Sequence, residues 1–136
     1  MGADIHAHVE VKIDGKWEYL SKITCDRWYN AFAWLSGVRS YSKDDWAFKD
    51  CRSLYEIPLS KEGEEEYRRW GSDAHSITVI HEEKLRQRFA EKLATMPNAQ
   101  ERKKDWEDSW LGTWVDICAG LKTYYDDVRV VMWYDN

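Results

Sequence analysis

The sequence predicts an α+β domain whose mostly antiparallel sheet, made of an N-terminal hairpin and a C-terminal strand, is packed on one face by several helices. Apolar and polar residues alternate over residues 4–13, as in a strand covered on one face. Residues 127–134 alternate too little in polarity for an edge strand, which indicates a strand buried near the middle of the sheet. Between these two ends, apolar residues recur at helical spacing.

The first predicted elements are the hairpin and a short helix. Asp14-Gly15 supplies a tight turn, after which residues 16–20 return as the second strand. Asp26 is the predicted N-cap of a helix that extends through Leu35. Gly37 can close the end of this helix.

The middle of the chain predicts an irregular segment followed by two helices. Residues 38–59 show no regular period, and segments of this length are often functional. Ser60 is the predicted cap of a short helix that ends near Trp70-Gly71. Residues 73–80 then read as an extended segment, and a further helix covers residues 82–95.

The longest predicted helix follows Pro97, which ends the preceding helix. Asn98 and Glu101 form a capping-box-like start. The apolar stripe of this helix consists of Trp106, Trp110, Trp114, Ile117 and Leu121. We expect the stripe to belong to the core, because an amphipathic helix needs one such face.

Composition limits the class of protein. The 136 residues predict a single domain over residues 1–136. The net charge is −5, with 20 basic residues interleaved among 25 acidic ones, so we do not expect nucleic acid as a partner. Three distant cysteines without a Cys-x-x-Cys pair fit a reducing cytosol. No apolar run reaches the roughly 18 residues of a membrane span, and we expect a cytoplasmic protein without a membrane partner.

The first strand carries a row of polar residues at every second position, namely Asp4, His6, His8 and Glu10. Alternate residues on a strand lie about 6.5–7 Å apart and point the same way. His6 and His8 could therefore hold a divalent metal ion, with a carboxylate from Asp4 or Glu10. The alternative is the solvated outer face of an ordinary hairpin.

Two further stretches could complete a site beside this row. Asp73 and His75 lie two positions apart, and a mixed His and carboxylate site forms if the sheet brings them next to His6. The alternative is a turn in which such side chains satisfy local backbone groups. Arg129 and Asp135 could lie on a strand next to the first one, where the alternative is an ordinary ion pair.

These stretches resemble a family of small, mostly uncharacterised proteins of phages, prophages and some bacteria. Its members begin Met-Gly-x-Asp-Ile-His, carry Arg-x-Tyr-x-x-Phe-Ala, Val-Arg and Asp-x-His-Ser, and finish near Val-Arg-x-Val-Phe-Trp-Phe-Asp-Asn. The corresponding residues here are 1–6, 27–33, 38–39, 73–76 and 128–136. The resemblance implies that the motif positions form one pocket; they are Asp4, His6, Arg27, Arg39, Asp73, His75, Arg129 and Asp135.

Three functions fit the sequence, and whether the protein is an enzyme stays open. The first is a phage-type accessory protein that binds a small phosphorylated or nucleotide ligand in a His, Asp and Arg pocket lined by Trp and Tyr, or that blocks a host defence protein; the phage and host setting comes from the resemblance alone. The second is a metal-dependent hydrolase with catalytic His6, Asp73 and His75 and a metal held by Asp4, His6 and His8. The third is a protein-interaction module with exposed Trp residues.

Overall fold

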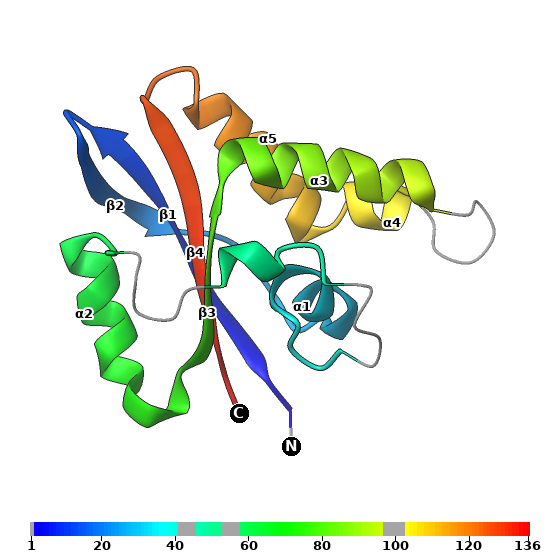
Figure 1. The fold of residues 1–136 in the computed structure, drawn as a ribbon, viewed down its shortest axis with the longest axis horizontal. Coiled ribbons are helices and arrows are strands. Elements are labelled where there is room, and N and C mark those ends of the chain that lie inside the picture. Colours follow the sequence, from blue (N-terminus) through cyan, green and yellow to red (C-terminus); the bar gives the residue numbers. More distant parts are fainter. Residues whose placement is uncertain (1, 41–45, 53–57, 97–102) are drawn as a thin grey trace.

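The fold is built on one four-stranded antiparallel sheet in the order β2-β1-β4-β3 (Figure 1). The structure is a computed structural model that describes residues 2–40, 46–52, 58–96 and 103–136. The strands are β1 (Asp4–Ile13), β2 (Lys16–Lys22), β3 (His75–His81) and β4 (Asp127–Asp135). The C-terminal strand lies between β1 and β3, which confirms its predicted position inside the sheet.

The predicted hairpin is confirmed. Asp14 and Gly15 adopt φ angles of 50° and 80°, the left-handed pair that a two-residue hairpin turn requires. β1 pairs with β4 from Asp4 opposite Asp135 to Lys12 opposite Asp127. The two chain ends therefore lie at one end of the sheet, opposite the hairpin tip (Figure 1).

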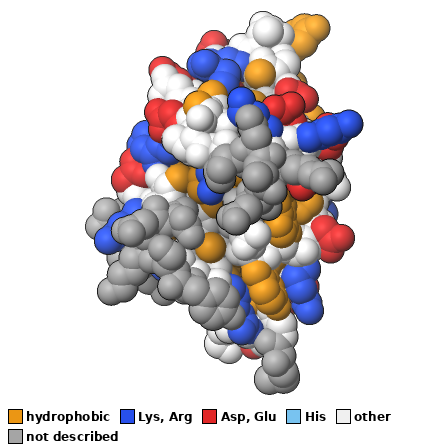
Figure 2. All heavy atoms as spheres, turned by 90° about the vertical axis from the view of Figure 1, so that its right-hand side faces the viewer, with side chains coloured by type: hydrophobic (Ala, Val, Ile, Leu, Met, Phe, Trp, Pro, Cys, Tyr) orange, Lys and Arg blue, Asp and Glu red, His pale blue; other side chains and the backbone are white. Residues whose placement is uncertain are grey.

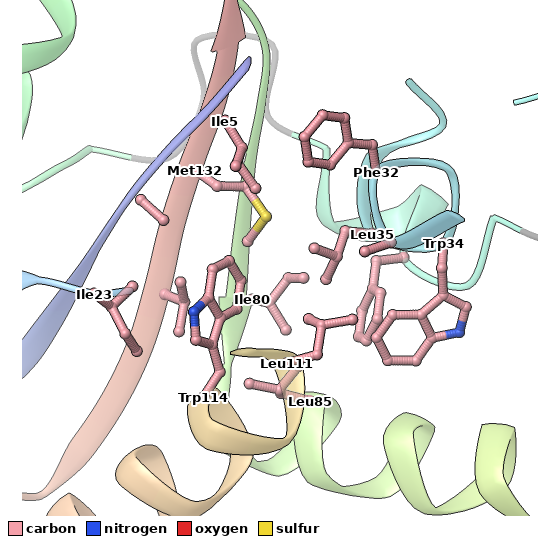
Figure 3. Packing of buried hydrophobic residues seen from close by; sticks show 14 of the residues in the cluster. Ile5, Ile23, Phe32, Trp34, Leu35, Ile80, Leu85, Leu111, Trp114 and Met132 are labelled. Carbon is pink, nitrogen blue, oxygen red and sulfur yellow. The ribbon is translucent and has the colours of Figure 1, made fainter. Parts of the chain in front are cut away.

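Four helices cover one face of the sheet, where the main core lies. They are α1 (Tyr29–Ser36), α3 (Glu82–Thr95), α4 (Lys103–Glu107) and α5 (Trp110–Leu121). Figure 3 shows Ile5 and Met132 from the strands facing Phe32 from α1, while Trp114 from α5 and Leu85 from α3 close the other side. On the side of the molecule drawn in Figure 2, acidic and basic side chains are interspersed, in keeping with the mixed charge of the sequence.

The predicted cap of the first helix is wrong. Trp28 is the N-cap residue of α1 and makes no side-chain cap bond. The Asp26 carboxylate instead accepts a hydrogen bond from the backbone N–H of Arg27, with an N to O distance of 2.7 Å. The predicted end of the helix is confirmed, since Gly37 has a φ of 69° and its N–H bonds the Ala33 carbonyl.

The single long helix predicted near the C-terminus is two helices, because a second cap interrupts it. The Ser109 hydroxyl accepts hydrogen bonds from the N–H groups of Leu111 and Gly112 at 3.2 and 3.4 Å, which starts α5 anew after α4. The predicted capping box and Pro97 lie outside the described residues. The stripe is only partly core, because Trp106 and Trp114 are buried while Ile117 is exposed.

The other face of the sheet is covered by α2 (Lys61–Trp70). Ser60 caps this helix by accepting from the Gly63 N–H at 3.1 Å, as predicted. A small apolar cluster of Val79, Val131 and Trp133 lies on this face, with Tyr67 and Trp70 of α2 packed against it. The polar row of β1 points to this covered face, where His6 contacts Trp70. The alternative of a solvated hairpin face is therefore wrong for His8 and Glu10, which are buried.

Short 3-10 turns link the remaining elements, η2 (Lys49–Cys51) and η3 (Gly71–Asp73). Asp73 thus belongs to a turn, and the strand predicted from residue 73 begins at His75. All nine Trp residues lie within the described ranges, and none of them is exposed. Within the same ranges, no helix has the length and apolar character needed to cross a bilayer.

Candidate functional site

The polar row of β1 divides into a buried pair and an accessible pair. His8 and Glu10 are 1% and 0% exposed, because they lie beneath the N-terminal half of α2. His6 is partly exposed and Asp4 is exposed. The row therefore forms two separate clusters.

The inner cluster consists of His8, Glu10, Ser60 and Arg129. One carboxylate oxygen of Glu10 accepts from Nε and Nη2 of Arg129 at 3.0 and 2.7 Å. The same Nη2 donates to the Pro58 carbonyl at 2.8 Å. The guanidinium lies 4.1 Å from the centroid of the Trp17 ring, a distance typical of a cation–π contact.

The second carboxylate oxygen of Glu10 is also fully engaged. It accepts from the Ser60 hydroxyl at 2.5 Å, the Ser60 N–H at 3.0 Å and Nε2 of His8 at 2.8 Å. Burial acts to raise the pKa of Glu10, but the hydrogen bonds from His8, Ser60 and Arg129 and the charge of Arg129 lower it to about 2. This cluster joins α2 to the sheet, and it leaves Arg129 no open side toward a ligand.

The outer cluster lies at the end of the sheet where the chain begins and ends, and we call it the terminal corner. It consists of Asp4, His6, Arg27 and Asp135. Nε2 of His6 lies 2.6 Å from a carboxylate oxygen of Asp135. Nε and Nη2 of Arg27 donate to Asp4 at 3.1 and 2.9 Å. Asp4 and Asp135 are opposite each other in the β1–β4 register.

An aromatic wall supports His6. The centroid of its ring lies 4.0 Å from that of Trp70 at the C-terminal end of α2 and 6.3 Å from that of Trp133 on β4. Since a carboxylate only accepts, Nε2 carries the hydrogen of this contact, and Nδ1 of the neutral ring is an acceptor. The Asp135 contact and the Trp70 wall therefore fix both the orientation and the tautomer of His6.

Two other predicted residues lie next to the terminal corner. The Arg39 guanidinium lies 5.5 Å from the centroid of the Tyr29 ring, and the Tyr29 hydroxyl accepts from the Ala3 N–H at 3.2 Å. Nε2 of His75 lies 3.2 Å from the side-chain oxygen of Asn136, which directly follows Asp135.

The structure thus places four of the eight motif positions in the terminal corner and two beside it. The other two lie elsewhere. Arg129 belongs to the inner cluster, and Asp73 is exposed in η3 without a hydrogen bond or ion pair to another described side chain.

A pocket of about 170 Å³ opens beside His6, where β2 leaves β1. Its lining combines the polar side chains of His6, Lys22 and Glu66 and the ring of Trp70 with four further residues, Ile5, Ala7, Ile23 and Cys25. Pockets for drug-sized ligands measure about 300 Å³ or more. This pocket therefore has room for a small ligand or for one group of a larger ligand.

Cys25 lines this pocket and contacts the backbone of β1. Its thiol donates to the Ile5 carbonyl, with an S to O distance of 3.7 Å. Burial, together with the charge of Asp26, raises the pKa of Cys25 to about 11 although the Ala7 N–H opposes the shift. A thiol with a raised pKa is mostly protonated at neutral pH, whereas the thiolate is the reactive form of a cysteine.

The predicted metal ligands have separate partners. Asp4 binds Arg27, His6 binds Asp135 and His8 binds Glu10. Within residues 2–40, 46–52, 58–96 and 103–136, no three His, Cys, Asp or Glu side chains are grouped so that they could hold a metal ion. A divalent ion at this row stays a prediction.

Sequence reasoning did not identify Lys22, Glu66 and Trp70 as site residues. They lie on β2 and α2, and no short motif links them to His6 in the sequence. A Trp at the very end of a polar helix was the one available signal, because such a ring must pack on something outside its own helix. Comparison of the chain with protein families, curated proteins and solved structures found no match, and the family resemblance stays a prediction.

Proposed function

We propose that this protein binds a small phosphorylated ligand, such as a nucleotide, at the terminal corner, in the manner of a phage-type accessory protein. The observation that supports the proposal most is the setting of His6. Its imidazole is held by Asp135, packed on Trp70 and lines the pocket beside Lys22. A partly exposed polar ring held this firmly is typical of a binding group.

The surrounding side chains supply what a phosphorylated ligand needs. Arg27 has a half-exposed side chain and Lys22 a largely exposed one, and both can donate to phosphate oxygens. The Trp70 ring offers a flat apolar surface on which a base could stack. Because of the small pocket volume, one group of the ligand would enter the pocket while the rest lies on the corner.

The His6–Asp135 contact also favours a second candidate, a small hydrolase. A neutral His6 whose Nε2–H bonds a carboxylate has Nδ1 as a proton acceptor, so it could act as a general base toward a water molecule or a hydroxyl group. Asp73, predicted as catalytic, lies outside the terminal corner in η3 and has no role in this candidate step. Turnover of a bound phosphate ester would favour the enzyme, and binding without turnover would favour the binder.

The test is a thermal-shift experiment with inorganic phosphate and a panel of nucleoside mono-, di- and triphosphates. At a ligand concentration of 100 Kd, binding stabilises the folded state by about 2.7 kcal/mol, which raises the Tm by roughly 10 °C. We expect such a rise for the wild type and its loss in His6→Gln.

A matched control is present on the same sheet. Nδ1 of His81 lies 2.9 Å from a carboxylate oxygen of Asp127, at the opposite end of β4. His81→Gln removes a similar His–Asp contact and should keep the ligand-induced shift. No shift with any compound of the panel, or equal loss in both variants, would contradict the proposal.

A further inference from the structure

We propose that Ser76 is the nucleophile of a second site, which hydrolyses small carboxylic esters through an acyl-enzyme. The site lies at the start of β3. Its polar groups are the side chains of Ser76, His75, Arg52 and Asn136, which are linked by hydrogen bonds. It uses neither His6 nor the pocket beside it, so this inference does not rest on the proposed function.

The backbone holds Ser76 in an unusual conformation. Its φ angle is 59°, in the left-handed region that residues with a Cβ rarely adopt. The pairing of β3 with β4 shifts register between His75 and Thr78. Oγ1 of Thr78 fixes this bulge by donating to the Ser76 carbonyl at 3.0 Å. Strained residues cluster at active sites, and bulges next to such sites re-aim a side chain.

The hydrogen bonds of Ser76 determine where each hydrogen lies. The side-chain oxygen of Asn136 only accepts, so Nε2 of His75, 3.2 Å away, carries a hydrogen and Nδ1 is an acceptor. Nη2 of Arg52 donates to Oγ of Ser76 at 2.5 Å. The Ser76 hydroxyl therefore donates its own hydrogen to Nδ1 of His75 at 2.9 Å. A nucleophile, its base and a group that orients the base are thus in contact, which is the arrangement of an activated serine.

Arg52 supplies the positive charge of this site. It pairs with Thr78 in an isolated antiparallel bridge beside β3, and its guanidinium lies 5.4 Å from the centroid of the Trp46 ring. Among the described residues it forms no ion pair with a carboxylate, so its charge is available to an oxyanion that forms next to Ser76. Phosphoryl transfer needs several cations, whereas a single oxyanion needs few donors. We therefore assign carboxylic esters as the substrate class.

The reaction has two balanced halves. In the first, the Ser76 hydroxyl passes its proton to Nδ1 of His75 while Oγ attacks the carbonyl carbon. The ester C–O bond breaks, and the leaving alcohol takes the proton from His75. In the second, water gives a proton to His75 and attacks the acyl group; the bond from Oγ to the acyl carbon breaks, and Ser76 regains its proton. Arg52 stabilises the oxyanion of each half.

The test uses the full chain and 4-nitrophenyl acetate as the probe ester. We expect the release of 4-nitrophenolate to begin with a burst approaching about one equivalent per chain, because an acyl-enzyme accumulates. Mass spectrometry of the quenched protein, followed by peptide mapping, should find the acetyl group on Ser76. An acetyl group found only on other residues would overturn the proposal.

A glycine variant removes the nucleophile without straining the fold. Glycine adopts a φ of 59° at no steric cost, so Ser76→Gly should fold and should lose both the burst and the acetyl group. Ser72→Ala changes an exposed serine of the neighbouring turn η3, and this matched control should keep both. A burst of equal size in Ser76→Gly and the wild type would overturn the proposal.

Two further positions test the base and the residue that positions it. His75→Gln should slow acylation by about 100- to 10,000-fold, the usual contribution of a general base. Asn136→Ala should lower kcat while KM stays unchanged, and Asn136→Asp, which keeps an accepting oxygen, should restore kcat. Equal acylation rates in His75→Gln and the wild type would overturn the activation of Ser76 by His75.

Discussion

Glu10 and Arg129 form a buried ion pair between two adjacent strands, although 119 positions separate them in the sequence. The carboxylate is 0% exposed and the arginine 2%. Ser60 binds the same carboxylate and caps α2, so the ion pair also anchors the helix. Because Trp70 at the far end of α2 forms the wall behind His6, the inner cluster positions part of the terminal corner.

Removing the charge of Arg129 should destabilise the protein strongly. Arg129→Met leaves the Glu10 carboxylate buried without its guanidinium partner, and breaking a buried pair in this way costs about 3–5 kcal/mol. Urea denaturation followed by Trp fluorescence measures the change. Arg68→Met is the matched control, because its exposed pair with Glu64 is worth about 0.5 kcal/mol or less. Equal losses in the two variants would contradict a structural role for the buried pair.

The folded state should lose stability in acid through Glu10. The pKa of Glu10 falls from 4.5 to about 2 on folding, so the unfolded chain binds the proton first as the pH drops. The stabilisation is complete above about pH 4.5 and is lost as the pH falls toward 2. It amounts to about 3 kcal/mol, since one pKa unit corresponds to 1.36 kcal/mol.

Glu10→Gln isolates this contribution from those of other carboxylates. The difference in unfolding free energy between wild type and variant should shrink by about 3 kcal/mol between pH 5 and 2. Denaturant curves at several pH values measure it. A difference that stays constant with pH would show that Glu10 does not titrate as the buried pair requires.

Gly63→Ala should destabilise the protein although alanine favours helices. A Cβ at position 63 would lie 2.5 Å from the Glu10 carboxylate and 2.8 Å from Nε2 of His8. These buried groups cannot move away without breaking their hydrogen bonds, and such overpacking costs about 1–3 kcal/mol. In Gly120→Ala the new methyl group meets no atom within 4 Å apart from its chain neighbours and the backbone of its own helix, so this control should gain about 0.5–1 kcal/mol. A stabilising Gly63→Ala would mean that α2 lies farther from the sheet.

The strands and most helix ends follow from local patterns. Alternating polarity, the Asp14-Gly15 turn and the Ser60 cap each act within a few residues, and the structure confirms all three. The prediction that Asp26 caps α1 failed, because its carboxylate accepts from the N–H of Arg27, which precedes the helix. The prediction of one long helix failed, because the Ser109 hydroxyl accepts from the N–H groups of Leu111 and Gly112 and so starts a new helix.

The site could not be predicted to the same extent, because its contacts join residues that are far apart in the sequence. The spacing of His6 and His8 correctly places them on one face of β1, but it does not reveal that α2 covers His8 and not His6. The sequence predicts Arg129 as a pocket residue or as a member of an ordinary ion pair, and it does not reveal that Arg129 is buried against Glu10 across the sheet. The His6–Asp135 contact follows from antiparallel pairing of the first and last strands, and only the register shows that their ends meet.

The most direct measurement of the central claim is a two-dimensional ¹H–¹⁵N NMR titration of the full chain with adenosine 5′-monophosphate. We expect the amide signals of His6 and Cys25 and the indole signal of Trp70 to move with increasing ligand, while those of His81 and Asp127 at the far end of the sheet stay in place. Saturable shifts confined to other parts of the chain, or none at all, would contradict ligand binding at the terminal corner.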